Sequence, residues 1–167
     1  LSSSGLEVQT GLIAHNLQTG ERLELASGSC DAITSTAEGF VASCEQRLSF
    51  WQQDEDGFNE VSQLDYWLHE LLFDPEKSEL LGLNLDPLAE SGIVALSYPE
   101  LNPIRFLAGH YVRLLGFNEN HHLLAVSWTD DGIRLEILGE VETLDSLILP
   151  EVYIPSLMLS PDRSALL

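Results

Sequence analysis

Short apolar runs separated by polar turns recur along this chain of 167 residues. Four segments share one pattern, in which an apolar strand, a polar turn and a second apolar strand follow one another: residues 32–43, 71–85, 114–128 and 157–167. Their turns contain Asp74-Pro75, Asn118 or Pro161-Asp162, residues that fix φ or bond to their own backbone. The pattern therefore predicts a series of antiparallel hairpins.

The hairpins repeat at a nearly constant interval. Phe73, Phe117 and Leu159 hold equivalent places and lie 44 and 42 residues apart. Alternating apolar residues between the hairpins predict further strands, at residues 47–51, 58–62, 92–98, 104–108, 133–138 and 144–149. A period of about 40–45 residues with four strands per unit is typical of β-propeller blades. We therefore expect an all-β fold, a β-propeller with about four blade units.

One segment fits two structures. Residues 64–73 place Leu64, Trp67 and Leu68 on one face of a helical turn, together with Leu71 and Leu72. The repeat register instead favours a strand over residues 69–73. Asp74-Pro75 ends the element in either case.

The two ends of the chain leave two architectures open. Residues 11–26 predict a hairpin with no strands before it, and residues 156–167 predict a partial blade with no strands after it. Full blades are expected at residues 32–62, 69–108 and 110–149, within a single domain, 1–167. Residues 11–26 either complete the last blade of a four-blade ring, or both ends are edges of a larger ring. The chain starts at Leu1 without an initiator Met, so we expect a fragment, a processed product or a trimmed chain. Of the two architectures we favour the fragment of a larger ring.

Residues 109–137 resemble one blade of the WD-repeat family. A Gly109-His110 pair precedes two apolar strands, an Asp131-Gly132 turn and a third strand. The resemblance implies that His110, Asp131 and Ser127 form a buried structural network within the blade. It also implies a Trp on the third strand, where this chain has Glu136. The family's Trp-Asp pair has only the loose counterpart Trp51-Gln52, so the resemblance is to a degenerate WD repeat.

The net charge of the chain limits the classes of partner that it can bind. The chain has 27 acidic and 7 basic residues, a formal net charge of −20. Such a surface repels nucleic-acid phosphates and anionic lipids, so we expect no direct nucleic-acid or membrane binding. The charge would favour a basic peptide or subunit as the partner. The alternative is that the acidity only aids solubility or suits a saline environment, and the spread of the acids along the chain agrees with this alternative. No apolar run approaches the roughly 20 residues that span a bilayer.

The two cysteines, Cys30 and Cys44, are too few for a disulfide framework or a zinc site. A hairpin over residues 32–44 brings them near each other, which makes a disulfide geometrically possible. The default expectation is two reduced thiols in an intracellular protein, either cytoplasmic or nuclear.

No residue pattern indicates catalysis or a cofactor. His110, His121 and His122 lack the spacing of metal ligands, and we read the acidic turns as solvated loops. There is no G-x-S-x-G elbow, Walker loop or G-x-G-x-x-G. Trp51, Trp67 and Trp128 are expected to pack between blades. We expect no catalytic, cofactor-binding or metal-binding residues.

The resemblance implies a non-enzymatic scaffold or adaptor that mediates protein–protein interactions in a multi-subunit complex. The alternative is a propeller enzyme or carbohydrate-binding module with its site on a propeller face. The expected inner strands are mainly apolar, with His69, Glu70 and Arg113 as their titratable residues, which counts against that alternative. A third possibility is that an open sheet edge receives a strand from another protein.

Overall fold

The computed structural model describes residues 11–15, 20, 22–54, 57–85, 90–130, 132–140, 142–149 and 157–160. Within these residues the fold is all-β, as predicted, and contains no helix. The strands are β1 (Gly11–His15), β2 (Arg22–Ser27), β3 (Cys30–Ser35), β4 (Gly39–Cys44), β5 (Arg47–Asp54), β6 (Gly57–Leu64), β7 (Glu70–Asp74), β8 (Glu79–Asn84), β9 (Gly92–Ser97), β10 (Pro103–Ala108), β11 (Tyr111–Phe117), β12 (Leu123–Thr129), β13 (Gly132–Leu138) and β14 (Thr143–Ile148).

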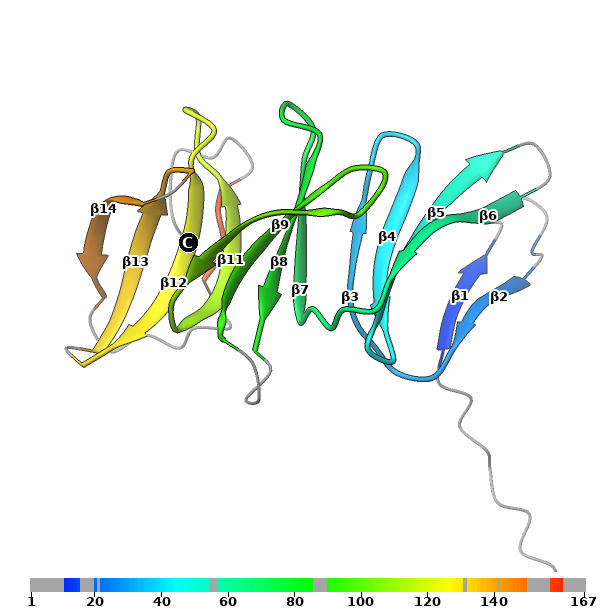
Figure 1. Cartoon of the computed structure of the whole chain (residues 1–167), viewed down its shortest axis with the longest axis horizontal. Helices are drawn as coiled ribbons and strands as arrows, with labels where there is room; N and C mark the ends of the chain where they lie inside the picture. The colour runs from blue at the N-terminus through cyan, green and yellow to red at the C-terminus, as the bar shows by residue number, and fades with distance from the viewer. Residues whose placement is uncertain are drawn as a thin grey trace, which may run out of the picture.

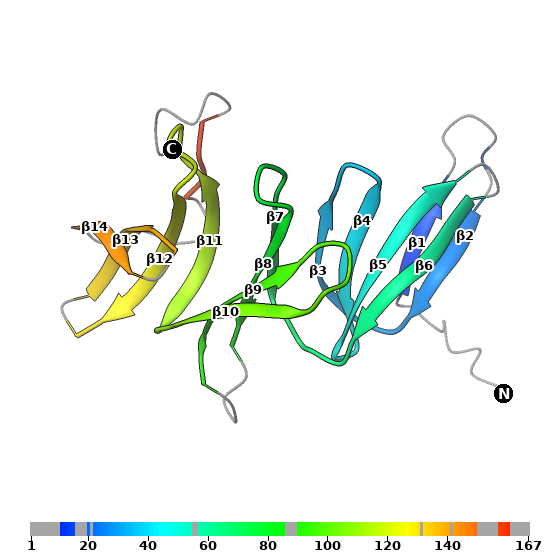
Figure 2. The same cartoon turned by 45° about the horizontal axis from the view of Figure 1, so that its top comes forward.

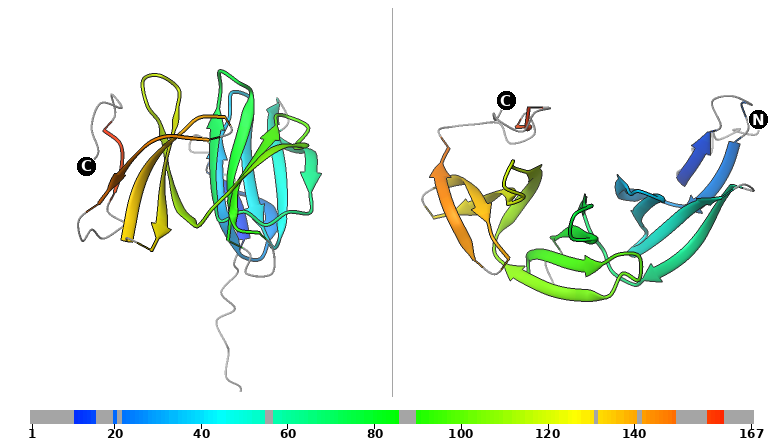
Figure 3. Two further views of the ribbon diagram at one scale, coloured as in Figure 1. Left: turned by 60° about the vertical axis from the view of Figure 1, so that its left-hand side comes forward. Right: turned by 90° about the horizontal axis from the view of Figure 1, so that it is seen from above.

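The strands form three four-stranded sheets and one two-stranded sheet (Figure 1). In each large sheet the strands pair antiparallel in chain order: β3–β6 form blade 1, β7–β10 form blade 2 and β11–β14 form blade 3. The remaining pair, β1 and β2, is called the terminal hairpin. The sheets stand face to face (Figure 2) along an open arc, and the terminal hairpin lies at the opposite end from blade 3 (Figure 3). This is the architecture of propeller blades.

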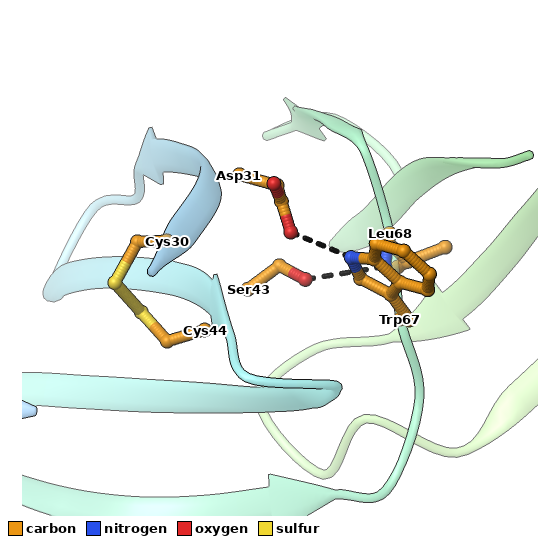
Figure 4. The surroundings of a disulfide bond; sticks show 6 residues. All are labelled: Cys30, Asp31, Ser43, Cys44, Trp67 and Leu68. Carbon is orange, nitrogen blue, oxygen red and sulfur yellow. Dashed lines mark hydrogen bonds between the residues drawn. A yellow bond between two sulfur atoms is a disulfide. The ribbon is translucent and has the colours of Figure 1, made fainter. Parts of the chain in front are cut away.

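The ambiguous segment forms a strand only in its second half. Residues 70–74 form β7, as the repeat register predicts, and residues 65–69 form an irregular connection between blades 1 and 2. The helical prediction for this segment is wrong. Neighbouring blades hold the connection in its irregular conformation. Leu68 is fully buried, and its side chain lies directly over Gly82, where a Cβ would come within 2.3 Å of it. The amide of Leu68 donates to the buried Ser43 hydroxyl, at 3.1 Å (Figure 4).

The core lies between blades, because successive residues of a strand face opposite sides of its sheet. On β8, Leu80 packs toward blade 1 with Val41 and Phe50. Its neighbour Leu81 packs toward blade 3 with Leu123. Each such side chain contributes about 1.5–3 kcal/mol when fully buried. The repeated two-sided strand pattern therefore holds consecutive blades together.

The cysteines are joined in a disulfide (Figure 4). The expectation of two reduced thiols is wrong. Cys30 on β3 and Cys44 on β4 are direct cross-strand partners, with Cα atoms 3.9 Å apart. The bond therefore links the innermost strand of blade 1 to the next strand.

The tryptophans do not all pack between blades. Trp128 is 51% exposed on β12, which corrects the expectation that it fills the core. Trp67 is half-buried, and its indole N–H donates to the Asp31 carboxylate of blade 1 at 2.6 Å (Figure 4). The described residues contain no helix long and apolar enough to span a membrane.

Candidate protein-interaction surface

The described turns that follow the first and third strands of the blades lie on one side of the arc. Each blade runs through four antiparallel strands, so the turn after its first strand and the turn after its third strand share that side (Figure 1). We call this side the loop face. The turn after each second strand, and the connection to the next blade, lie on the opposite side.

The loop face is acidic. Its described turns and their margins carry exposed carboxylates from all three blades: Glu38, Asp54, Glu76, Glu100, Glu119, Glu140 and Glu142. Lys77 is the only lysine or arginine among the described residues of these turns. Because every blade contributes, the negative potential extends along the arc and does not come from a single loop.

Two ion pairs fix the loops of blade 2 against those of blade 3. Glu76 lies 3.1 Å from the His121 imidazole, and Lys77 Nζ donates to Glu140 at 3.2 Å. The Asp74 carboxylate is almost fully buried and accepts the amide of Glu76 at 3.0 Å, which shapes the β7–β8 turn. These contacts hold the acidic loops in position relative to one another, although each exposed ion pair contributes little to stability.

A buried polar network lies inside blade 3. The Ser127 hydroxyl on β12 donates to Glu136 on β13, and the Thr143 hydroxyl donates to the other oxygen of Glu136 at 2.8 Å. Ser127 and Glu136 are both buried. Burial raises the pKa of the nearby Tyr111, with a second contribution from the Glu136 charge, while a bond to Thr143 opposes the shift. The network is structural, because it joins neighbouring strands of one sheet.

This arrangement differs from the one that the WD resemblance implies. Ser127 is buried, but its partner is Glu136, the residue at the family's Trp position. The His110 side chain is exposed, and its carbonyl accepts the Trp128 amide at 2.9 Å. Asp131 lies outside the described residues, so its predicted bond to His110 stays a prediction. The sequence signal for Glu136 is a charged residue among the alternating apolar residues of β13. This strand pairs with β12, which contains Ser127.

The inner strands are tied together by Glu70. This carboxylate on β7 accepts the Leu114 amide of β11 at 2.6 Å. Burial raises the pKa of Glu70, while the Leu114 bond and the charge of Arg113 lower it. The His69 ring packs against Trp67 in a tilted arrangement, with ring centroids 4.5 Å apart. Glu70 thus joins blades 2 and 3, while His69 packs within the connection that precedes β7. Among the described residues, no group of His, Cys, Asp and Glu is arranged to hold a metal ion.

Comparison with protein-family models and with curated proteins gave no match. Among solved structures, the chain is similar to the WD40 β-propeller domain of Doa1, with a TM-score of 0.55 and 15% sequence identity. The fold is a WD40-type β-propeller arc. The match covers 92% of this chain but 52% of that chain, so this chain spans about half the length of that propeller. The open arc in Figure 3 agrees with that proportion.

Proposed function

We propose that this propeller arc is a non-enzymatic scaffold or adaptor that holds protein partners within a multi-subunit assembly. The carrying observation is the loop face, which bears exposed carboxylates from all three blades and, among the described residues of its turns, no lysine or arginine besides Lys77. Turns presented by a rigid sheet scaffold are suited to recognition, and WD40-type propellers are generally protein-interaction folds. The proposed partner is a Lys/Arg-rich peptide or subunit.

The charge of the loop face determines which properties of binding it affects most. Complementary charge mainly increases the rate of association and the discrimination between partners. The interaction should therefore weaken as salt screens the exposed charges, since the Debye length falls from about 10 Å at 0.1 M to about 3 Å at 1 M.

The test is calorimetric titration with a synthetic peptide of alternating Lys and Ser residues. A charge-reversed loop face, Glu100→Lys with Glu119→Lys and Glu142→Lys, is expected to lower affinity by about tenfold or more at low salt. The matched control reverses three exposed acids that lie away from the loop face, Glu45→Lys with Glu90→Lys and Asp130→Lys. Both variants change the net charge equally. Equal losses in the two would show that net charge alone attracts the peptide, and would overturn the loop face as the site.

A further inference from the structure

A pocket of about 450 Å³ lies between the first hairpins of blades 2 and 3, two blades in which all four strands are present. Leu72, Asp74 and Glu76 line it from blade 2, and Phe117 and His121 line it from blade 3. Glu76 and His121 belong to turns of the loop face, so the pocket reaches that acidic surface. Its volume is at the small end of the usual range for ligand sites, about 300–1,000 Å³. A pocket of this size has room for one side chain of a docked protein.

A buried carboxylate lines this pocket. Asp74 is 2% exposed, and its Oδ1 accepts the amides of Glu76 and Lys77 at 3.0 and 3.3 Å. Its other oxygen, Oδ2, accepts no hydrogen bond from the described residues. The basic side chains of the adjoining turns are paired elsewhere, since Lys77 binds Glu140 and His121 binds Glu76. A buried charge without a counter-ion is costly. The wall of the pocket therefore offers a carboxylate oxygen that a cationic ligand would stabilise.

The turn itself does not need the charge of Asp74. Asp74 and Asn118 hold equivalent places in the first hairpins of blades 2 and 3. Asn118 Oδ1 accepts the amides of Asn120 and His122 at 2.9 and 3.0 Å. A neutral amide oxygen thus shapes the equivalent turn of blade 3. The negative charge at Asp74 is therefore available for a second role, beyond the shape of its own turn.

We propose that this pocket binds an arginine side chain of the protein partner, with the guanidinium paired to Asp74 Oδ2. The inference rests on the proposed function, because it places one residue of a basic partner docked on the loop face. Arginine fits better than lysine, since its guanidinium is more weakly hydrated and better suited to buried ion pairs. The methylene stem packs along Leu72 and Phe117. A metal ion fits less well, because no group of His, Cys, Asp and Glu in the described part of the chain is arranged to hold one.

The probe is the tripeptide acetyl-Gly-Arg-Gly amide, titrated against the intact chain and followed by the backbone amide shifts in NMR. We expect the largest shifts at the amides of Glu76 and Lys77, which bond to the same carboxylate. The same tripeptide with citrulline in place of arginine has nearly the same shape but no charge. It should bind about tenfold more weakly or less tightly still, because it loses the charge-assisted hydrogen bond.

Asp74→Asn should weaken binding of the arginine tripeptide by about tenfold or more. The asparagine keeps an oxygen acceptor for the turn, as Asn118 does in blade 3, so the thermal unfolding midpoint should not fall. The matched control is Glu38→Gln, which removes one negative charge from the loop face outside the pocket. Glu38 is exposed, and glutamine keeps an acceptor for the Gln52 amide group.

Each outcome decides the proposal. Equal losses with Asp74→Asn and Glu38→Gln would overturn it, because net charge alone would then attract the arginine. An arginine tripeptide that does not bind, or a citrulline tripeptide that binds equally well, would also overturn it without any variant of the chain. A lysine tripeptide that binds as tightly would overturn the choice of arginine.

The Lys-Ser peptide tests the proposed function separately. If that peptide fails to bind while the arginine tripeptide binds through Asp74, the extended loop face fails and the pocket stands. The reverse result would leave the loop face standing and overturn the pocket.

Discussion

The Ser127 hydroxyl donates a hydrogen bond to the Glu136 carboxylate across neighbouring strands, and both side chains are buried. Glu136 also accepts the Thr143 hydroxyl, so one carboxylate joins β12, β13 and β14. A buried polar network with satisfied members favours one packing of its surroundings. In this chain the acid occupies the place where the WD resemblance implies a tryptophan.

Glu136→Ala is expected to lower the free energy of unfolding by about 1–3 kcal/mol, because two hydroxyls lose their acceptor. Urea unfolding of the intact chain measures the change. The control is Glu142→Ala at an exposed turn position, with an expected change within about 0.5 kcal/mol. Equal effects of the two substitutions would show that the network does not stabilise blade 3.

Ser43→Ala is expected to destabilise the chain by about 1–3 kcal/mol, because the buried Leu68 amide loses its acceptor. Ser35→Ala, at an exposed position of the neighbouring strand, is the matched control. Thermal unfolding followed by circular dichroism compares the two. If Ser43→Ala behaves like Ser35→Ala, the hydroxyl does not anchor the connection between blades 1 and 2.

Removing the disulfide with Cys30→Ala and Cys44→Ala is expected to cost about 3 kcal/mol, because the unfolded chain regains the freedom of the closed loop. The cysteines are 14 residues apart in sequence. Chemical unfolding of the wild-type chain with and without reductant gives a second measurement. A wild-type chain that is unchanged by reductant, and as stable as the double variant, would mean that the thiols are not joined.

Stability is expected to depend on pH through Glu70. Burial raises its pKa above the value of 4.5 taken for the unfolded chain. The folded state therefore holds the proton more tightly, and this contribution to stability is complete below pH 4.5. It is lost as pH rises through the folded pKa.

Glu70→Gln keeps an oxygen acceptor for the Leu114 amide but does not ionise. The stability of this variant relative to wild type should rise with pH above about 4.5 and then level off. Urea unfolding from pH 4 to 8 measures the difference in the free energy of unfolding between the variant and the wild type. The effect of net charge that the two chains share largely cancels in this difference. A difference that stays constant with pH would contradict the raised pKa.

The sequence is sufficient to predict the strands, because alternation and turn residues are local signals. It predicts the blade period for the same reason, since each blade repeats that local pattern. The structure of residues 65–69 was not predictable from periodicity. Leu68 and Trp67 are held by Gly82, Ser43 and Asp31, which belong to other elements.

The candidate interaction surface is harder to predict from the sequence than the fold is. The net charge indicates an acidic protein. That the acidic turns lie on one side of the molecule follows only from the direction of the strands in the three blades. The pocket at Asp74 is harder still to predict. A buried aspartate before a proline is indistinguishable in sequence from an exposed turn residue, because its burial depends on the neighbouring blade.

Amide hydrogen exchange with and without the Lys-Ser peptide tests most directly whether the loop face binds basic protein partners. We expect slower exchange at the loop-face turns, residues 36–38, 76–78 and 118–122, and unchanged exchange at residues 45–46 and 109–110 on the other side, as evidence for this binding. Slower exchange on the other side, or evenly over both sides, would contradict it.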